Sequence, residues 1–508
     1  MTDRVRNAGR DAARAAHDWR NTEGQATTAP VAPRAATGDI PVEEFRQAGH
    51  ALVEWIADYI SHPERYPVLS RVAPGDIRNA LPAWPPERGE PVDAAIADFE
   101  RTILPGITHW NHPGFFGYFA VTGSMPGILG ELLTAALNVN GMVWRTSPSA
   151  TELEQVVLDW LRQMLGLPAG WFGMITDTAS ISTLLALAAA REARSELAIR
   201  ERGMAGRDDL PVLRIYASEQ AHSSVDKAAI ALGIGHTNVV RVGVDDEFRL
   251  RPDLLAQAIA DDRAAGRIPL AVVATVGTTS TTSVDPVRAV GEICRREGAW
   301  LHVDGAYAGM AAISPARREI LDGIELADSF VTNPHKWLFT PVDCSALYVA
   351  RPDVLRRAFV LVPEYLTTRE QDVTVNYMDY GVQLGRRFRA LKLWMVIRAF
   401  GREGIASRLE EHMRLARTVA EWVRAEPGWR VEAPVPFSTV CFRCAPEGMS
   451  EAEADAWNER ALERVNASGV AFLSHTRLRG RYVLRLSIGH LRTTEAELRR
   501  AWEVLRAG

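Results

Sequence analysis

Two ionisable side chains stand at the ends of predicted β-strands, the edge of an α/β sheet where ligands bind. Asp304 lies in LHVDGAYAG, just before Gly305, where we expect the strand to end. Lys336 lies in SFVTNPHKW, and Pro334 interrupts that strand just ahead of it. A lysine between two apolar runs is partly desolvated, which lowers its pKa and leaves a free amine for an imine bond.

Together, the amine and the carboxylate match what pyridoxal phosphate (PLP) requires of a protein: an imine partner and an acid for the pyridinium nitrogen. The chain has three lysines, Lys227, Lys336 and Lys392. We expect Lys227 on the polar side of a helix start and Lys392 on a solvated or ion-paired helix face. Taken singly, a strand-end aspartate is more often a cap and a loop lysine is usually solvated. The pair on neighbouring strands favours the catalytic interpretation.

Weaker signals surround this pair. His222 in SEQAHSSVDKA either neighbours a helix cap or stacks on a flat cofactor. Ala179 and Ser180 begin a predicted helix, whose N–H groups could hold a phosphate. Thr279 follows another strand in ATVGTTSTTSVDP, a loop-like hydroxyl cluster.

Two further motifs favour structural interpretations. Cys441 and Cys444 form a lone CxxC inside a predicted strand, which indicates packing. His109 and His112 lack partners at metal spacing, so we predict no metal site. Arg485 could meet a substrate carboxylate, as in aminotransferases.

The elements around these residues predict an α/β fold. Short apolar strands at 212–218, 270–277, 299–306 and 329–337 alternate with helices, which indicates a mostly parallel sheet covered on both faces, with antiparallel strands allowed at its edge. Long helices and alternating strands follow, typical of a small α+β domain. We predict four parts: a flexible tail (1–39), an N-terminal helical segment (40–124), a large domain (125–395) and a small C-terminal domain (396–508).

Composition excludes several classes of protein. The 508 residues are 47% hydrophobic and 24% charged, with a net charge of −5, so the chain is neither disordered nor a typical nucleic-acid binder. No apolar run is long enough to cross a bilayer, and the first residues do not resemble a secretory signal. We expect a cytoplasmic protein without nucleic-acid or membrane partners.

The motifs resemble those of the PLP-dependent group II decarboxylases, most closely the aromatic-L-amino-acid decarboxylases. The resemblance covers roughly residues 40–508, with NPHKW and HVDGAYAG as its strongest signals. Further matches are EEFRQAGHALVEWIADY, THWNHPGFFGYF, SPSATELE and LGRRFRALKLWMVIRAFG. The resemblance implies the aspartate-aminotransferase-like fold (fold type I of PLP enzymes) and a homodimer with its active sites at the subunit interface.

The resemblance also implies roles for the candidates. Lys336 would form the internal aldimine, and Asp304 would pair with the pyridine nitrogen. His222 would stack on the ring and Ala306 on its other face. The remaining cofactor contacts would be Thr279 near the ring and, around the phosphate, Ala179, Ser180, Asn333 and His335.

The implied reaction is decarboxylation of an aromatic L-amino acid (tryptophan, 5-hydroxytryptophan, tyrosine, DOPA or phenylalanine) to an arylalkylamine through a quinonoid. A tyrosine on a mobile loop, about Pro363–Tyr380, would supply the proton. Counting back from LGRRFR assigns Tyr377, with Tyr380 as the rival. Alternatives are an oxidative aldehyde synthase, a decarboxylase of a non-aromatic amino acid and, remotely, a non-catalytic scaffold. Aldehyde-forming relatives carry Phe at the tyrosine or Asn at the stacking histidine, so this chain favours simple decarboxylation.

The resemblance places six residues in a substrate pocket: Trp110, Tyr118, Phe119, Asn140, Met142 and Gly385. In the family that this chain resembles, glycine at the position of Gly385 is typical of members that accept indole substrates, which favours a tryptophan-like side chain. Asn140 and Met142 stand where larger apolar groups are usual, and Asp177 adds a carboxylate before the phosphate turn.

Overall fold

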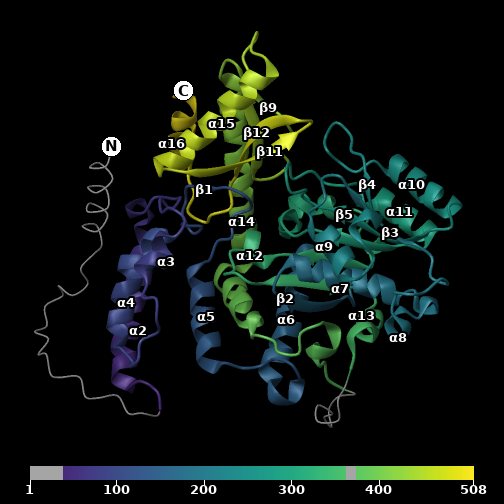
Figure 1. The fold of residues 1–508 in the computed structure, drawn as a ribbon, viewed down its shortest axis with the longest axis horizontal. Helices are drawn as coiled ribbons and strands as arrows, with labels where there is room; N and C mark the ends of the chain where they lie inside the picture. The colour runs from purple at the N-terminus through teal and green to yellow at the C-terminus, as the bar shows by residue number, and fades with distance from the viewer. Residues whose placement is uncertain (1–37, 362–372, 508) are drawn as a thin grey trace, which may run out of the picture.

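The computed structural model describes residues 38–361 and 373–507. Residues 1–37 of the predicted tail and residues 363–372 of the predicted loop lie outside them. Within the described residues the centre is a seven-stranded sheet in the order β2-β8-β7-β6-β5-β3-β4 (Figure 1). Its strands are β2 (Phe172–Thr176), β3 (Leu213–Ser218), β4 (Val239–Val242), β5 (Ile268–Thr275), β6 (Trp300–Asp304), β7 (Ser329–Thr332) and β8 (Ser345–Val349).

Six of these strands run in one direction, so their carboxyl ends share one edge of the sheet. β8 is the exception and pairs antiparallel with both β2 and β7. The prediction of a mostly parallel sheet is confirmed, although the antiparallel strand lies one place in from the edge. Thr275 pairs with Asp304 at the shared edge, and Asp304 pairs with Val331 on β7.

Alternation along the strands divides the large domain into two apolar cores, because successive side chains point to opposite faces. In β5, Val272 and Ala274 join one core and Ala271 and Val273 join the other. The first core is covered by α6 (Pro148–Leu165), α10 (Pro252–Ala264), α11 (Val287–Glu297) and part of α14 (Arg389–Ala425). The second is covered by α7 (Ala179–Glu192), α9 (Ser224–Ala231) and α13 (Pro352–Phe359).

A second, five-stranded sheet has the order β1-β11-β12-β10-β9. Its strands are β1 (Phe115–Phe116), β9 (Trp429–Val431), β10 (Thr439–Cys444), β11 (Phe472–Leu478) and β12 (Arg481–Ser487), and α15 (Glu451–Ser468) and α16 (Glu495–Arg506) pack on it. Cys441 and Cys444 are buried in β10, which confirms the packing interpretation of the CxxC motif.

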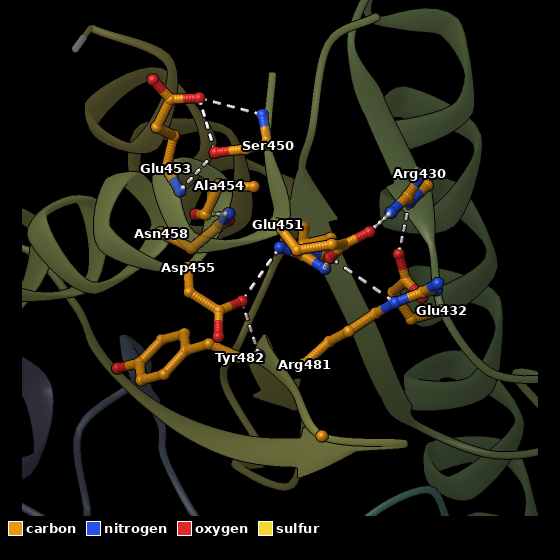
Figure 2. A network of polar contacts seen from close by, with 12 residues as sticks. Arg430, Glu432, Ser450, Glu451, Glu453, Ala454, Asp455, Asn458, Arg481 and Tyr482 are labelled. Atoms are coloured by element: carbon orange, nitrogen blue, oxygen red, sulfur yellow. Dashed lines mark hydrogen bonds and ion pairs between the residues drawn. The ribbon is translucent and has the colours of Figure 1, made fainter. Parts of the chain in front are cut away.

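Charged side chains fasten α15 to this sheet (Figure 2). The guanidinium of Arg443 is fully buried and donates hydrogen bonds to Glu451 at 2.6 Å and to Asp455 at 3.0 Å. Arg430 and Arg481 extend the network through ion pairs with Glu451. The first turn of the helix is thereby held against β10 and β12.

Two segments join the parts of the molecule. β1, from the predicted N-terminal segment, pairs with β11 of the small sheet. α14 contacts α5 (Met125–Leu137) and α6 at one end and β9 and β10 at the other, running through the middle of Figure 1. Since α14 crosses position 395, with a break at Gly401 (φ 61°), the domain boundaries stay a prediction.

The remaining helices lie towards the N-terminus or are short: α2 (Val42–Ser61), α3 (Asp76–Ala80), α4 (Val92–Asp98), α8 (Ile199–Arg202) and α12 (Pro334–Trp337). Within residues 38–361 and 373–507, no helix is both long and apolar enough to cross a membrane.

Candidate functional site

Lys336 and Asp304 lie beside each other on the carboxyl edge of the large sheet. Asp304 is the last residue of β6, and the neighbouring β7 ends four residues before Lys336, which lies in α12. Burial lowers the pKa of the Lys336 amine; the nearby Asp304 carboxylate opposes this shift, and Arg485 reinforces it. The chain therefore offers a desolvated amine next to a buried carboxylate.

The other two lysines have different surroundings. Lys227 is exposed on α9, as expected. Lys392 is fully buried and forms an ion pair with Glu131. The prediction of an ion-paired face is thus confirmed for Lys392 and that of a solvated face is wrong, because α5 packs directly over this part of α14.

His222 lies between β3 and α9, near the same edge. Its Nδ1 accepts the backbone N–H of Ser224 at 3.1 Å, so the neutral ring carries its proton on Nε2. Partial burial lowers the pKa of His222, with Asp304 opposing the shift and Lys336 reinforcing it. His222 is nevertheless exposed in this chain, and its place over a cofactor ring stays a prediction. Ala306 is buried two residues after Asp304, and its N–H donates to Asp304 Oδ1 at 2.9 Å.

The predicted phosphate residues surround the start of α7 and α12. The N–H groups of Ala179 and Ser180 precede the first hydrogen bonds of α7, which run from Ile181 and Ser182 to the carbonyl of Thr178. Asn333 is buried and its side-chain Oδ1 has no partner among the described residues.

Three further side chains lie at the ends of strands along this edge. Burial lowers the pKa of His335 to about 3, and its Nδ1 accepts the N–H of Cys344. Asp177 directs a carboxylate oxygen back to the N–H of Thr178 at 2.5 Å. Thr279 is exposed on the turn after β5.

The three aromatic residues of the predicted pocket lie in two groups. Trp110 stacks on Tyr118 with ring centroids 5.7 Å apart, and both are exposed. Phe119 lies deeper, and its ring centroid is 5.4 Å from Lys336 Nζ. Phe119 thus forms an apolar wall beside the lysine, and Trp110 and Tyr118 form a separate stacked pair at the surface.

The sequence analysis missed the residues that support this wall. Tyr307 stacks on Phe119 at 3.9 Å and on Trp337 at 4.7 Å, so the rings next to Ala306 and Lys336 form one column with the pocket. Both rings occur inside the motifs HVDGAYAG and NPHKW. Their position beside the catalytic candidates was the available signal.

Asn140, Met142 and Gly385 form a separate cluster. Asn140 Oδ1 accepts the N–H of Arg386 at 3.0 Å, and the N–H of Gly141 donates to the Arg386 carbonyl at 2.8 Å. Asn140 Nδ2 is 3.8 Å from the position that a Cβ on Gly385 would occupy. No contact joins this cluster to Phe119 or Lys336 among those the structure shows for the described residues.

Tyr377 and Tyr380 lie away from the site edge. The Tyr377 hydroxyl donates to the carbonyl of Gly173 at 3.4 Å, three residues before the carboxyl end of β2 and so about 10 Å along the strand from that edge. Tyr380 stacks on Phe172 at 4.5 Å. The Tyr377 hydroxyl is thus buried against the β2 backbone, and the assignment of Tyr377 as proton donor stays a prediction. The remaining tyrosine of the predicted loop, Tyr365, lies outside the described residues.

The sequence matches a family model described as the pyridoxal-dependent decarboxylase conserved domain, over residues 74–445. It is 41% identical over 473 residues to phenylacetaldehyde synthase of Arabidopsis thaliana, covering 91% of this chain and 95% of that one. It is 39% identical over 476 residues to aromatic-L-amino-acid decarboxylase of Catharanthus roseus, covering 92% and 94%. The crystal structure of Oryza sativa TDC with PLP and tryptamine matches with a TM-score of 0.88 at 38% identity, covering 92% and 98%.

Proposed function

Because the chain belongs to the pyridoxal-dependent decarboxylase family, we propose that it converts an aromatic L-amino acid to the arylalkylamine and CO₂. The family assignment makes the chain a PLP-dependent carboxy-lyase of fold type I whose substrate is a free amino acid. The choice of an aromatic substrate rests on one observation: the apolar ring of Phe119 lies 5.4 Å from Lys336 Nζ.

The residues at the sheet edge fit PLP. The buried amide of Asn333 has an unpartnered end, and an amide can present either end to a ligand. The first N–H groups of α7 have no backbone acceptor among residues 38–361 and 373–507 and can bind an anion. We assign the phosphate to Ala179, Ser180, Asn333 and His335. When bound, the cofactor supplies an electron sink for the pair left behind as the carboxylate departs.

The remaining cofactor roles follow from the chemistry of each side chain. The desolvated Lys336 amine binds the cofactor's aldehyde carbon, because a neutral amine is the nucleophilic form. Asp304 uses Oδ1 for the N–H of Ala306, and we assign its other oxygen to hold the proton of the ring nitrogen. As the resemblance implies, His222 and Ala306 would cover the two faces of the ring, and Thr279 would lie near the ring.

The last step needs a proton at Cα, and the resemblance implies that a loop tyrosine delivers it. Tyr377 and Tyr380 are packed against Gly173 and Phe172. We therefore assign the donor role to Tyr365, the other tyrosine of the predicted loop. A hydroxyl donor at Cα favours the amine over the aldehyde.

A homodimer accounts for the separation of the two pocket clusters. Asn140 and Met142 follow α5, one face of which is exposed and apolar; its residues are Met125, Leu129, Leu132, Leu133 and Leu137, each about half exposed. The opposite face, with Gly130, packs on α14. An apolar face of this kind is typical of a protein interface. We propose that a second copy covers it and that Asn140, Met142 and Gly385 complete the partner's site.

Product mass spectrometry of the purified PLP-loaded protein tests this function. L-tryptophan, 5-hydroxytryptophan, L-tyrosine, L-DOPA, L-phenylalanine, L-histidine and L-glutamate are offered in competition. We expect an arylalkylamine, with indole substrates preferred because position 385 is glycine. One relative is a phenylacetaldehyde synthase, so aldehyde, ammonia and peroxide with O₂ consumption would establish that alternative instead. Turnover of L-glutamate or L-histidine alone would contradict the aromatic assignment.

A further inference from the structure

Arg485, on β12, is a buried cation with no acidic partner among the described residues. Its residue is 4% exposed, and no carboxylate in the described part of the chain lies within ion-pair distance. Nε donates to the carbonyl of Ser280 at 3.0 Å and Nη1 donates to the carbonyl of Tyr118, while Nη2 has no partner in the described part of the chain. A buried charge without a counter-ion is costly and therefore points to a functional requirement.

The two carbonyls belong to loops that carry site residues. Ser280 follows Thr279 on the turn after β5, and Tyr118 precedes Phe119 in the pocket wall. Tyr118 has a positive φ of 52°, a conformation that a bulky side chain rarely adopts without support. The Arg485 guanidinium therefore holds two loops that are far apart in the sequence in one place.

The same guanidinium contacts the pocket wall and acts on the reactive amine. Its Cζ lies 4.5 Å from the ring centroid of Phe119, a cation–π distance. Lys336 Nζ lies 5.4 Å from that centroid, so the two cations share one ring. The charge of Arg485 also lowers the pKa of Lys336, after the larger effect of burial.

We propose that Arg485 is a positioning residue that sets the place of Phe119 and the turn at Thr279 around Lys336, and thereby the fit of the aromatic substrate side chain. This inference rests on the proposed function for its substrate, and on the contacts of Arg485 with Phe119, Ser280 and Tyr118 for its effect on the site around Lys336. It differs from a carboxylate clamp, because Nε and Nη1 are occupied by backbone carbonyls and the guanidinium stacks on Phe119.

The test compares Arg485→Met and Arg485→Lys holoenzymes with the wild type. Tryptamine has no carboxylate. Comparing it with L-tryptophan therefore distinguishes a role of Arg485 in placing the aromatic side chain from a role in binding the carboxylate. With Arg485→Met we expect the affinity for tryptamine and the KM for L-tryptophan to weaken together, by about tenfold or more, since one stacking contact and two hydrogen bonds are lost. Weakened L-tryptophan binding with unchanged tryptamine binding would overturn the proposal in favour of a carboxylate clamp.

A spectroscopic measurement tests the proposal without requiring substrate turnover. In Arg485→Met the visible absorbance of the lysine-bound cofactor is expected to titrate at higher pH, by about half a unit or more, because a nearby positive charge is gone. Arg485→Lys retains the charge and should titrate close to the wild type while losing the tryptamine affinity. An unchanged titration in Arg485→Met contradicts the electrostatic part even if no aromatic acid is turned over.

Arg481→Met is the matched control. It lies on the same strand, with an exposed side chain paired to Glu432 and Glu451. Its tryptamine affinity and absorbance titration should equal those of the wild type. Equal losses in both variants would mean that any arginine removed from β12 disturbs the site and would overturn a specific role for Arg485.

Discussion

At the residue scale, Lys336 and Asp304 are brought together by strand pairing rather than by a direct hydrogen bond. β6 and β7 are parallel neighbours, so the residues that follow them share one edge. Two opposing effects also act on the pKa of Lys336: burial favours the neutral amine, and the Asp304 carboxylate limits how far the pKa falls. In the proposed site, Lys336 and Asp304 must lie close enough to interact electrostatically and far enough apart for the cofactor ring to fit between them.

Lys336→Ala is expected to abolish covalent attachment of the cofactor. Borohydride reduction followed by digestion and mass spectrometry should place the pyridoxyl group on Lys336 in the wild type and nowhere in the variant. Lys227→Ala, on the exposed side of α9, is the control and should retain the label. A labelled peptide containing Lys392 would show that the assignment of the nucleophile is wrong.

The two tyrosine assignments predict opposite outcomes. Tyr365→Phe should reduce amine formation and divert product to aldehyde, ammonia and peroxide, because the proton at Cα is lost. Tyr377→Phe should leave the amine-to-aldehyde ratio unchanged and lower thermal stability slightly, since only a 3.4 Å hydrogen bond to Gly173 is removed. Aldehyde formation in Tyr377→Phe alone would restore the sequence-based assignment.

At the element scale, β-strand periodicity was a reliable guide. The runs predicted at 212–218, 270–277, 299–306 and 329–337 became β3, β5, β6 and β7 with ends shifted by a few residues. The fourth run divides at Asn333 because Pro334 lacks an N–H for the ladder and begins α12 instead. That division turns Lys336 into the third residue of a short helix over the sheet edge.

Arg443 should be a strong determinant of small-domain stability. Its fully buried guanidinium joins β10 to Glu451 and Asp455 of α15 (Figure 2). Arg443→Met leaves both carboxylates without this partner, and we expect a loss of about 1–3 kcal/mol in the free energy of unfolding. Urea denaturation measures it.

Arg414→Met serves as the control for that measurement. Arg414 forms an exposed ion pair with Glu411 one turn away on α14. We expect the loss of this pair to lower the free energy of unfolding by less than about 0.5 kcal/mol. Equal destabilisation by the two variants would show that burial of Arg443 contributes nothing specific.

At the scale of the whole molecule, the proposed homodimer predicts that one charge on α5 separates the subunits. Leu132 is 55% exposed on its apolar face. Leu132→Glu should sediment as a monomer and lose activity, because a buried charge at an interface is costly and each site loses the partner's Asn140 and Met142. Leu254→Glu, on α10, should remain dimeric. A wild-type monomer with full activity would contradict the shared site.

Buried histidines make stability depend on pH across the whole molecule. Burial lowers the pKa of His412 to about 4, and its neutral form is held by the Trp337 N–H at 3.0 Å and the His490 carbonyl at 3.1 Å. The folded pKa lies below the unfolded value of about 6.5, so this stabilisation is complete above pH 6.5 and is lost as pH falls towards 4.

Proton uptake on unfolding measures this effect. At pH 5.5 the His412→Gln protein should take up about one proton fewer than the wild type, since the unfolded histidine is largely protonated there and the folded one is not. His236→Gln, a substitution at a less buried position, provides the comparison. Equal uptake by His412→Gln and the wild type would mean that His412 is charged in the folded protein.

The sequence by itself determined the sheet-edge chemistry of this protein. Strand periodicity and strand-end residues depend on local spacing, so Asp304, Lys336 and the parallel sheet were predictable, and the family followed from the motifs. Contacts between distant segments depend on how layers pack. Only the tertiary structure therefore decided that Tyr307 and Trp337 support Phe119, that Tyr377 lies on β2, that Asn140 and Met142 stand apart from Lys336, and that Arg485 reaches Tyr118 across 367 positions of sequence.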